Sequence, residues 1–302
     1  MISEGIGNGK IILFGEHFVV YGAPAIACGI ANSAVVRVER SDRNRIITKQ
    51  TVVEELSLAG IEAVLKSMGI KERYSVHLDG DLPTYGGLGS SAAFCVGLVR
   101  ALCKEKGIHL TNDQVNSHAY AGEMAFHGNP SGVDNTMATH GGVVEFRRGK
   151  TMAESRFEFI DLKKPLDIVV SFSGKYSPTP KMVERVAKYK AEDETEFAQL
   201  SDEYMSIHME GRKSIEKGKI DIIGQLMNSN QELLSELGVS DEKNDRIIQI
   251  ALKNGALGAK VTGGGGGGCC IALAKDRADA EKIGKALEKE GFPSFPTRIE
   301  KR

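Results

Sequence analysis

Residues 83 to 92 constrain the fold more than any other stretch of this chain. They read Pro-Thr-Tyr-Gly-Gly-Leu-Gly-Ser-Ser-Ala, and the residues that follow, to Leu102, are mostly apolar helix formers. Glycines leave backbone N–H groups unobstructed, and a helix N-terminus adds free donors and partial positive charge. The stretch therefore predicts a loop that opens a helix and binds an anion. A glycine-rich turn in which Ser90 or Ser91 caps the helix is the alternative.

This loop does not match the two commonest phosphate-binding motifs. A P-loop needs a lysine directly after its last glycine, and none follows here. The dinucleotide-binding fingerprint needs a third glycine where Ala92 stands. The sequence therefore predicts phosphate binding of another type, in which a serine hydroxyl at the helix start can also reach a phosphate-bound Mg²⁺.

Composition excludes several classes of function. The chain has 302 residues, a net charge of −1 and 41% hydrophobic residues, so no basic excess indicates nucleic acid or an anionic membrane. No apolar run approaches the length of about 20 residues that a spanning helix needs. Five cysteines without a C-x-x-C pair are typical of reduced, packed thiols. We expect a cytoplasmic protein with neither a membrane anchor nor a nucleic-acid partner.

The order of predicted elements favours an α+β fold. Period-two alternation predicts a strand at 34–40, and Thr111 to Gln114 form a capping box that opens a helix to about residue 126. Residues 180–253 are predicted to be largely helical, with breaks near Gly218 and Gly238, and a strand–helix–strand pattern follows. The other predicted strands include 10–17, 18–22, 24–27, 74–78, 142–146 and 166–172, and a further helix is predicted at 51–68. Strands, a helical block and then a mixed segment indicate α+β rather than repeated βαβ units.

Two further segments carry candidate functional residues. Six consecutive glycines, Gly263 to Gly268, lie between two predicted strands, and their conformational freedom costs roughly 0.5–1 kcal/mol each relative to alanine. Such a cost indicates backbone that must approach something closely, although a flexible connector is the alternative. In the third segment, Glu123 and Asp134 are each compatible with an ordinary solvated charge. Together with two glycine loops, they make a coherent set for phosphoryl transfer. His127 is predicted to be a structural turn residue, with a ligand role as the alternative.

Four motifs resemble the mevalonate kinase branch of the GHMP kinases, a family that also includes galactokinase, homoserine kinase and phosphomevalonate kinase. They are the segments at 10–17 (Lys-Ile-Ile-Leu-Phe-Gly-Glu-His), 83–92, 127–135 (His-Gly-Asn-Pro-Ser-Gly-Val-Asp-Asn) and 260–269. They occur in the family's order across nearly the whole chain, and the segment at 127–135 is the most specific to that branch. The chain departs from the family at Asn8, where proline is usual, and at Gly264, where alanine is usual.

The resemblance implies a role for each motif residue. Asp134 would be the catalytic carboxylate that faces the substrate hydroxyl, and Lys10 would keep it ionised and neutralise transition-state charge. Ser91 and Glu123 would hold Mg²⁺. The residues implied to bind ATP are Pro83, Gly86, Gly87, Leu88, Gly89, Ser90, Ser91 and Ala92. Those implied to bind the substrate, beside Asp134, are Glu16, His17, Thr262 and Gly263.

The same resemblance implies the architecture and the reaction. We expect a two-lobed fold with the active site between the lobes: an N-terminal ATP-binding lobe at 1–170 and a C-terminal lobe at 171–302. The implied reaction is ATP-dependent phosphorylation of the 5-hydroxyl of (R)-mevalonate, in isoprenoid precursor biosynthesis. The alternatives are a sister kinase for phosphomevalonate, homoserine or galactose, and a binding protein that keeps the fold without turnover. Many relatives are dimers, so a homodimer is a possible assembly.

Overall fold

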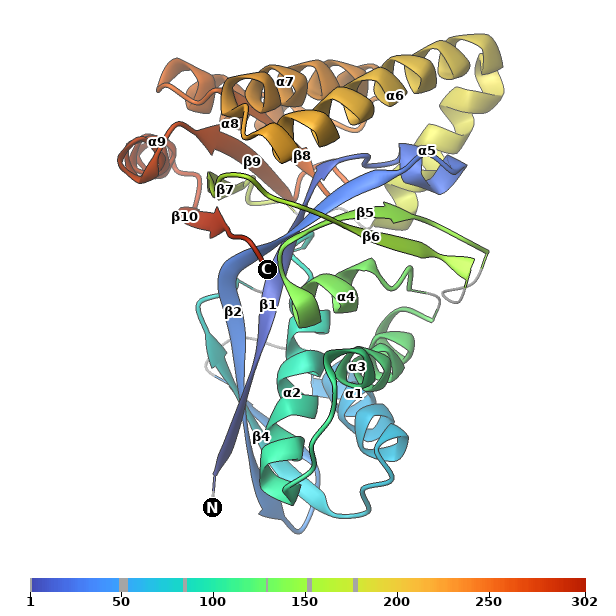
Figure 1. Ribbon diagram of the computed structural model, residues 1–302, viewed down its shortest axis with the longest axis vertical. Helices are drawn as coiled ribbons and strands as arrows, with labels where there is room; N and C mark the ends of the chain where they lie inside the picture. The colour runs from blue at the N-terminus through green and yellow to red at the C-terminus, as the bar shows by residue number, and fades with distance from the viewer. Residues whose placement is uncertain (1, 49–53, 84–85, 129, 151–153, 176–178) are drawn as a thin grey trace. The chain divides into compact units, whose positions relative to one another are not determined.

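The computed structural model describes residues 2–48, 54–83, 86–128, 130–150, 154–175 and 179–302 (Figure 1). The chain forms two compact units. The first contains residues 1–10, 29–84 and 88–141, and the second contains 11–28, 85–87 and 142–302. Strands β1 (Ser3–Phe14) and β2 (Ala25–Ser41) each contribute one end to each unit. The mixture of helices and strands confirms the predicted α+β class, whereas the lobe boundary at residue 170 and the active site between lobes stay predictions.

The sheet of the first unit is built on the second half of β2. Residues 34–41 pair antiparallel with β4 (Arg73–Gly80), and β3 (Arg45–Thr48) pairs parallel with β4. Val36 and Val38 are fully buried while Arg37 between them is half-buried. This alternation confirms the period-two prediction for the strand, because successive side chains of a strand point to opposite faces.

Helix α2 (Ser90–Lys106) lies at the centre of the first unit and is buried along most of its length. Around it pack α1 (Glu54–Ser67), α3 (Asn112–His127) and α4 (Val133–His140). Two glycines of β1 allow the strand and α2 to touch, since a Cβ atom at Gly7 would lie 2.0 Å from the Ala93 carbonyl oxygen. One at Gly5 would lie 2.2 Å from the carbonyl oxygen of Gly97. The alternate glycines of β1 therefore bring the start of α2 close to the strand that carries Lys10.

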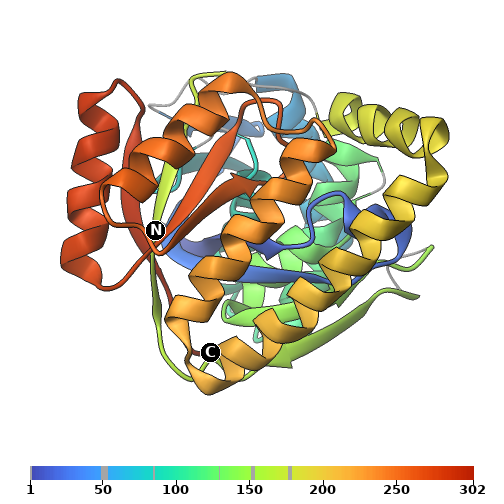
Figure 2. The same cartoon turned by 90° about the horizontal axis from the view of Figure 1, so that it is seen from above.

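The second unit contains an antiparallel sheet in the order β10–β7–β9–β8. Its strands are β7 (Leu166–Phe172), β8 (Gly258–Thr262), β9 (Cys269–Ala274) and β10 (Ser294–Ile299). Helix α9 (Arg277–Lys289) packs on β7 and β10, while α7 (Ile220–Glu236) and α8 (Glu242–Lys253) pack on β8. Helix α6 (Glu194–Lys217) runs beside α7 and follows α5 (Thr179–Glu192) (Figures 1 and 2).

A hairpin of β5 (Val143–Arg147) and β6 (Arg156–Ile160) pairs with the first residues of β2, also in the second unit. The breaks predicted at Gly218 and Gly238 are confirmed, because both glycines lie just beyond a helix end with positive φ angles. The strand predicted at 18–22 is wrong. Residues Phe18–Tyr21 form a 3-10 helix, in which the Phe18 ring stacks on Tyr204 at 4.6 Å.

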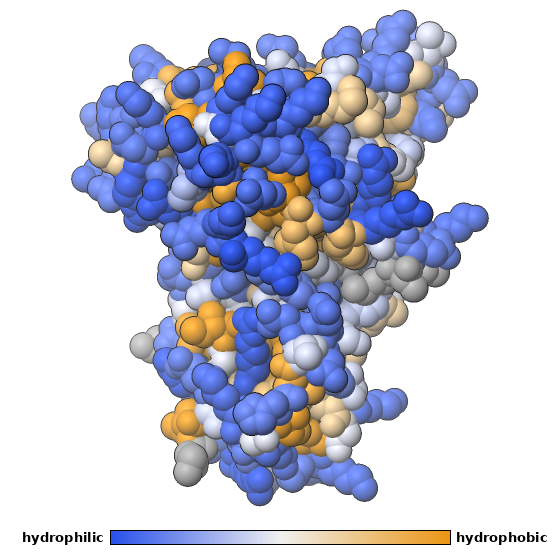
Figure 3. All heavy atoms as spheres, in the orientation of Figure 1, coloured by the Kyte–Doolittle hydropathy of each residue, from blue (hydrophilic) through white to orange (hydrophobic). Residues whose placement is uncertain are grey.

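Polar and charged side chains cover most of the face that Figure 3 shows. Along the described parts of the chain, no helix combines the length and the apolar character needed to cross a membrane. Many apolar side chains are buried within the two units, as the fully buried Leu98, Leu102 and Ile168 illustrate.

Candidate active site

The glycine–serine loop opens α2 as predicted, but neither serine caps it. Gly89 is the N-cap residue, with φ 69° and no side-chain cap bond, and the helix already includes Ser90 and Ser91. The alternative of a serine cap is therefore wrong, because both serines lie inside the first turn of the helix. Of the other predicted phosphate residues, Leu88 and Ala92 are buried and Pro83 is half-buried. The first turn of α2 leaves backbone N–H donors for an anion.

Lys10 and Asp134 form an ion pair beside this loop, within the first unit. The Nζ atom of Lys10 lies 3.1 Å from Oδ1 of Asp134, and the two side chains are 6% and 34% exposed. The backbone N–H of Lys10 donates to the Leu88 carbonyl at 2.8 Å. A Cβ atom at Gly89 would lie 2.9 Å from Cγ of Lys10, so only glycine fits there. Residues 124 positions apart in the sequence thus meet at the start of α2.

Helix α4 places Asp134 in its first turn. The loop predicted at 127–135 ends earlier than expected, because Gly132 (φ 81°) is already the N-cap of α4. Asn135 is fully buried, and its side-chain amide donates to Oδ1 of Asn116 on α3 at 2.6 Å. Asn116 in turn donates to the Thr136 hydroxyl at 3.2 Å. These bonds fix the register of α4 against α3 and thereby hold the Asp134 carboxylate in place. Sequence reasoning did not identify Asn135.

Glu123 lies on α3 and is only 1% exposed. Burial raises its pKa to about 8, and the nearby Asp134 charge acts in the same direction, while Ser91 and Lys10 oppose the rise. Within the part of the chain that the structure describes, Oε1 of Glu123 has no hydrogen-bond partner. His127, predicted to be structural, lies with Nε2 3.1 Å from the Ser91 hydroxyl and 3.9 Å from Oε2 of Glu123.

A buried carboxylate oxygen without a partner, next to a serine hydroxyl, fits a divalent cation. The described residues contain no group of three or more His, Cys, Asp or Glu side chains that could hold a metal alone. Mg²⁺ is typically held by one or two carboxylates with water and substrate phosphates. Glu123 and Ser91 alone therefore supply too few ligands for Mg²⁺, and phosphate oxygens and water would have to complete its coordination.

The predicted substrate residues other than Asp134 lie in the second unit. Thr262 exchanges two hydrogen bonds of 3.0 Å with the backbone of Ile12, one accepted and one donated. His17, which has a φ of 65° that is uncommon for a non-glycine residue, bonds through Nε2 to the Gly264 carbonyl at 3.0 Å. Burial lowers the pKa of His17, so its imidazole is neutral at physiological pH. Glu16 precedes it in the same turn and is 2% exposed.

Lys260 is a site residue that sequence reasoning missed as a functional group. Its ammonium is paired with the Glu16 carboxylate, and both side chains are fully buried. It also donates to the Val261 carbonyl at 2.6 Å. Burial lowers the pKa of Lys260, and the Glu16 charge opposes this fall. The signal was a lysine within an otherwise small and apolar strand segment, because lysines are almost never fully buried unless they are paired.

The loop from Gly263 to Gly268 needs its glycines. Five of the six have positive φ angles, and a Cβ atom at Gly265 would lie 2.2 Å from the Val239 carbonyl oxygen. A Cβ atom at Gly263 would also lie 3.3 Å from Cα of Gly87. The two glycine segments therefore touch, in agreement with the predicted close approach of backbone. They share a cavity of about 50 Å³ in the second unit, lined by Gly86, Gly87, Thr179, Thr262, Gly264, Gly265 and Gly268.

Comparison with known proteins identifies the family. Residues 55–142 match the model of the GHMP kinase N-terminal domain, and residues 212–293 match that of the GHMP kinase C-terminal region. The chain belongs to the GHMP kinase family. This GHMP kinase is 33% identical to a mevalonate kinase of Pyrococcus furiosus, over 96% of its own length and 94% of that protein.

Solved structures agree with this family. The crystal structure of L. major mevalonate kinase in complex with R-mevalonate matches with a TM-score of 0.92 and 33% identity, over 99% of this chain and 96% of that one. Methanococcus jannaschii mevalonate kinase matches with a TM-score of 0.82 and 27% identity, over 99% of this chain and 98% of that one. The GHMP kinase thus shares its fold with these enzymes over nearly its full length.

Proposed function

We propose that this protein transfers the γ-phosphoryl group of ATP to the 5-hydroxyl of (R)-mevalonate, which yields 5-phosphomevalonate. The observation that carries the proposal is the Lys10–Asp134 ion pair of 3.1 Å beside the N-terminus of α2. The choice of acceptor is supported by relatives that are mevalonate kinases, one of them bound to R-mevalonate. The free, buried cysteines agree with a reducing, cytoplasmic compartment.

Asp134 accepts or orients the hydroxyl proton of the acceptor. Beside a phosphate, a carboxylate that accepts a proton is surrounded by negative charge. The ammonium of Lys10, 3.1 Å away, places a compensating positive charge next to the Asp134 carboxylate. The same ammonium can stabilise the charge that develops on the transferred group. The hydrogen bond from Asn135 to Asn116 keeps Asp134 aimed, since positioning supplies much of the rate enhancement in phosphoryl transfer.

The loop from Gly86 to Ser91 and the first turn of α2 bind the ATP phosphates through backbone N–H groups. Ser91 and Glu123 would hold Mg²⁺, which would neutralise negative charge on the phosphates. Glu123 suits this role because its carboxylate is buried and one oxygen lacks a partner in the described chain. A cation would favour the ionised form that burial now disfavours.

Glu16, His17, Thr262 and Gly263 form the acceptor end of the site in this proposal. Lys260 positions Glu16, because its buried ammonium fixes that carboxylate in one orientation. Thr262 is held by its two bonds to the backbone of Ile12. A homodimer stays a prediction, which a molar-mass measurement in solution can test.

The test is a panel of acceptors assayed for ADP release: mevalonate, phosphomevalonate, homoserine, galactose and a blank without acceptor. Mevalonate should give the highest kcat/KM by at least about a hundredfold, which corresponds to roughly 2.7 kcal/mol of differential transition-state binding. Better turnover of phosphomevalonate, homoserine or galactose would replace the proposed acceptor with a sister substrate. No turnover of any acceptor would favour a binding protein that keeps the fold.

A further inference from the structure

The β5–β6 hairpin places like charges directly opposite each other. In its antiparallel register Glu145 faces Glu158, and Arg147 faces Arg156. Directly opposed residues point to the same face with Cβ atoms about 4.5–5.5 Å apart, and like charges at such positions are destabilising. One face of the hairpin therefore carries a pair of carboxylates next to a pair of guanidinium groups, and each pair needs neutralising charge.

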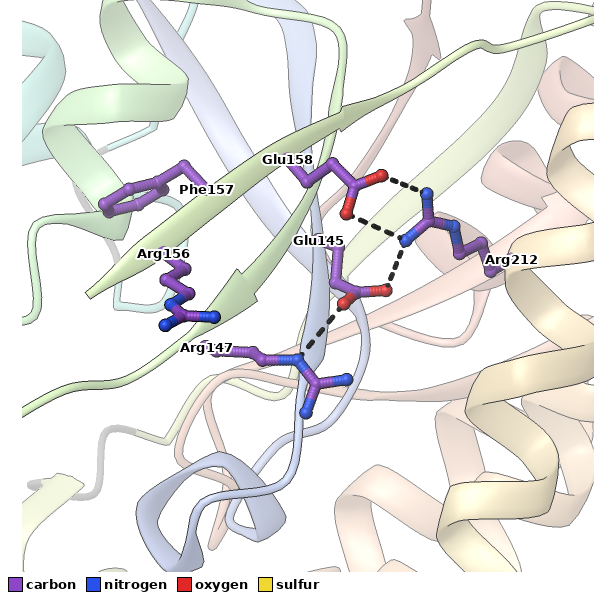
Figure 4. A pocket seen from close by; sticks show the side chains of 6 residues that line it. All are labelled: Glu145, Arg147, Arg156, Phe157, Glu158 and Arg212. Carbon is purple, nitrogen blue, oxygen red and sulfur yellow. Dashed lines mark hydrogen bonds and ion pairs between the residues drawn. The ribbon is translucent and has the colours of Figure 1, made fainter. Parts of the chain in front are cut away.

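The glutamate pair is neutralised by α6. Nη1 of Arg212 lies 3.0 Å from Oε2 of Glu145 and 3.2 Å from Oε2 of Glu158, and Nη2 makes a further bond to Glu158. His208 adds a contact of 3.0 Å from Nε2 to Oε2 of Glu145. Figure 4 shows Arg212 reaching both carboxylates from the side of the helix. These contacts account for the two glutamates as a structural link between hairpin and helix.

The arginine pair is compensated only in part. Arg147 is held only through Nε, 3.3 Å from Oε1 of Glu145, and its side chain is 49% exposed. Both of its terminal nitrogens are free of protein partners in the described chain, and Arg156 makes no ion pair or hydrogen bond there. Figure 4 accordingly draws Arg156 without a dashed line. The guanidinium groups of Arg147 and Arg156 therefore offer unpaired N–H donors from opposed positions on one face of the hairpin.

Local charge and space favour a small anion there. Residues 147–156 include four basic side chains and one acidic one, in a chain whose net charge is −1. The arginines line an open cavity of about 610 Å³ in the second unit, whose walls are Glu145, Arg147, Arg156, Phe157, Glu158 and Arg212 (Figure 4). Guanidinium groups bind phosphate and carboxylate oxygens bidentately. A ligand with two or more negative charges could neutralise both arginines at once.

We propose that Arg147 and Arg156 form a binding site for a small multivalent anion, a phosphate compound or a polycarboxylate. None of the residues proposed to bind ATP, Mg²⁺ or mevalonate belongs to it, so the inference goes beyond the proposed function. Arg147 is pre-oriented by its Nε bond to Glu145, and Arg156 closes on the ligand from the opposed strand. Binding weakens as salt is added, because both groups are partly open to solvent.

Isothermal titration calorimetry tests the site with pyrophosphate and citrate as probes and acetate as a monovalent comparison. A non-hydrolysable ATP analogue, in excess and without added magnesium, occupies the nucleotide loop. The variants are Arg156→Gln and the double variant Arg147→Gln/Arg156→Gln, and the matched control is Arg148→Gln, an exposed neighbour that does not line the cavity. We expect the wild type and the control to bind at least one divalent or trivalent probe with one site. We expect affinity to fall at least tenfold in the double variant.

Thermal unfolding in buffer without multivalent anions separates this site from a structural role. Without probe, the variants should have the same Tm as the wild type or a slightly higher one, because one or both of two opposed like charges are removed. The bound probe should raise the Tm of the wild type but not that of the double variant. The proposal is overturned if the double variant binds the probe as well as wild type, if acetate binds equally well, or if Tm falls by several degrees in the variants. Kinase activity is not measured here, so failure of the acceptor panel and failure of this site are distinguishable.

Discussion

The buried Lys260–Glu16 pair supports a quantitative prediction about stability. At an effective dielectric constant of about 20, two unit charges in ion-pair contact attract by about 4 kcal/mol or more. Both side chains are fully buried, so water does not screen the pair. Replacing Lys260 by methionine leaves the Glu16 carboxylate buried without its ammonium. We therefore expect Lys260→Met to lower the free energy of unfolding by about 3–5 kcal/mol at neutral pH.

Urea unfolding at several pH values measures this loss. In Lys260→Met, burial without the ammonium raises the pKa of Glu16 above its unfolded value. A carboxyl group whose pKa is raised on folding lowers the free energy of unfolding as pH rises. The stability that Lys260→Met loses relative to wild type should therefore become smaller as pH falls and Glu16 takes up a proton. The double variant Glu16→Gln/Lys260→Met should recover much of the stability, because no buried charge remains.

The matched control is Lys301→Met, which removes one partner of the Lys301–Asp161 pair of 2.7 Å, whose side chains are 68% and 66% exposed. Exposed pairs contribute little, so this change should leave the urea midpoint unaltered. A Lys260→Met protein that is no less stable than Lys301→Met would refute the reasoning about the buried pair.

Further predictions concern Glu123 and Asn135. Glu123→Gln should lose most kinase activity and require more Mg²⁺ for what remains, and an unchanged Mg²⁺ titration would show that Glu123 is not a metal ligand. Because burial raises the pKa of Glu123 to about 8, its carboxyl costs the metal-free protein stability as pH rises from about 4.5 to 8. Glu123→Gln should therefore gain stability relative to wild type across that window, as urea midpoints would show. Asn135→Ala should lower the free energy of unfolding by about 1–3 kcal/mol, because it removes the hydrogen-bond partner of Asn116. It should also lower kcat more than it changes the KM for ATP. An unaltered kcat would mean that α4 does not need this hydrogen bond to position Asp134.

Local chemistry predicted several elements well. The capping box at Thr111 and Gln114 is present, with both reciprocal bonds, because it depends on residues three apart. The strand at 34–40 was also predicted from neighbouring residues, because buried Val36 and Val38 alternate with the half-buried Arg37. The glycines at 218 and 238 marked helix ends, since their positive φ angles suit a left-handed C-terminal residue.

Errors occurred where tertiary contacts or backbone geometry outweighed local pattern. Residues 18–21 are apolar like a strand, yet positive φ at Gly15, His17 and Gly22 makes the chain turn there, and the Phe18 ring stacks on Tyr204. Strand β6 was missed although Phe157 and Phe159 alternate with Arg156 and Glu158, a period-two pattern that is typical of a half-buried strand. Helix α4 starts within a motif of glycine, asparagine and threonine, which are poor helix formers. It is held by long-range bonds to Asn116.

The candidate site also contains residues that the sequence predicted and residues that only the structure revealed. Residue types and the family resemblance named Lys10, Glu123 and Asp134, and the structure brings all three together in the first unit. The resemblance alone paired Lys10 with Asp134, because nothing local links positions so far apart. Lys260 and Asn135 lie within two of the family motifs, but their buried partners Glu16 and Asn116 lie elsewhere in the sequence, so the motifs did not reveal these contacts. The two glycine segments were recognised as loops, but the contact between Gly87 and Gly263 appears only in the fold.

A double-mutant cycle on Lys10 and Asp134 tests the central claim most directly. Asp134→Asn should lower kcat by about a thousandfold while ATP still binds, and Lys10→Met should also lower kcat severely. Since Lys10 lies 3.1 Å from Asp134 and acts through it, the double variant should be little worse than the worse single variant. Calorimetry of ATP binding to each variant controls for loss of the phosphate loop. Losses in kcat that simply multiply would mean that the two residues act independently, and would contradict the mechanism.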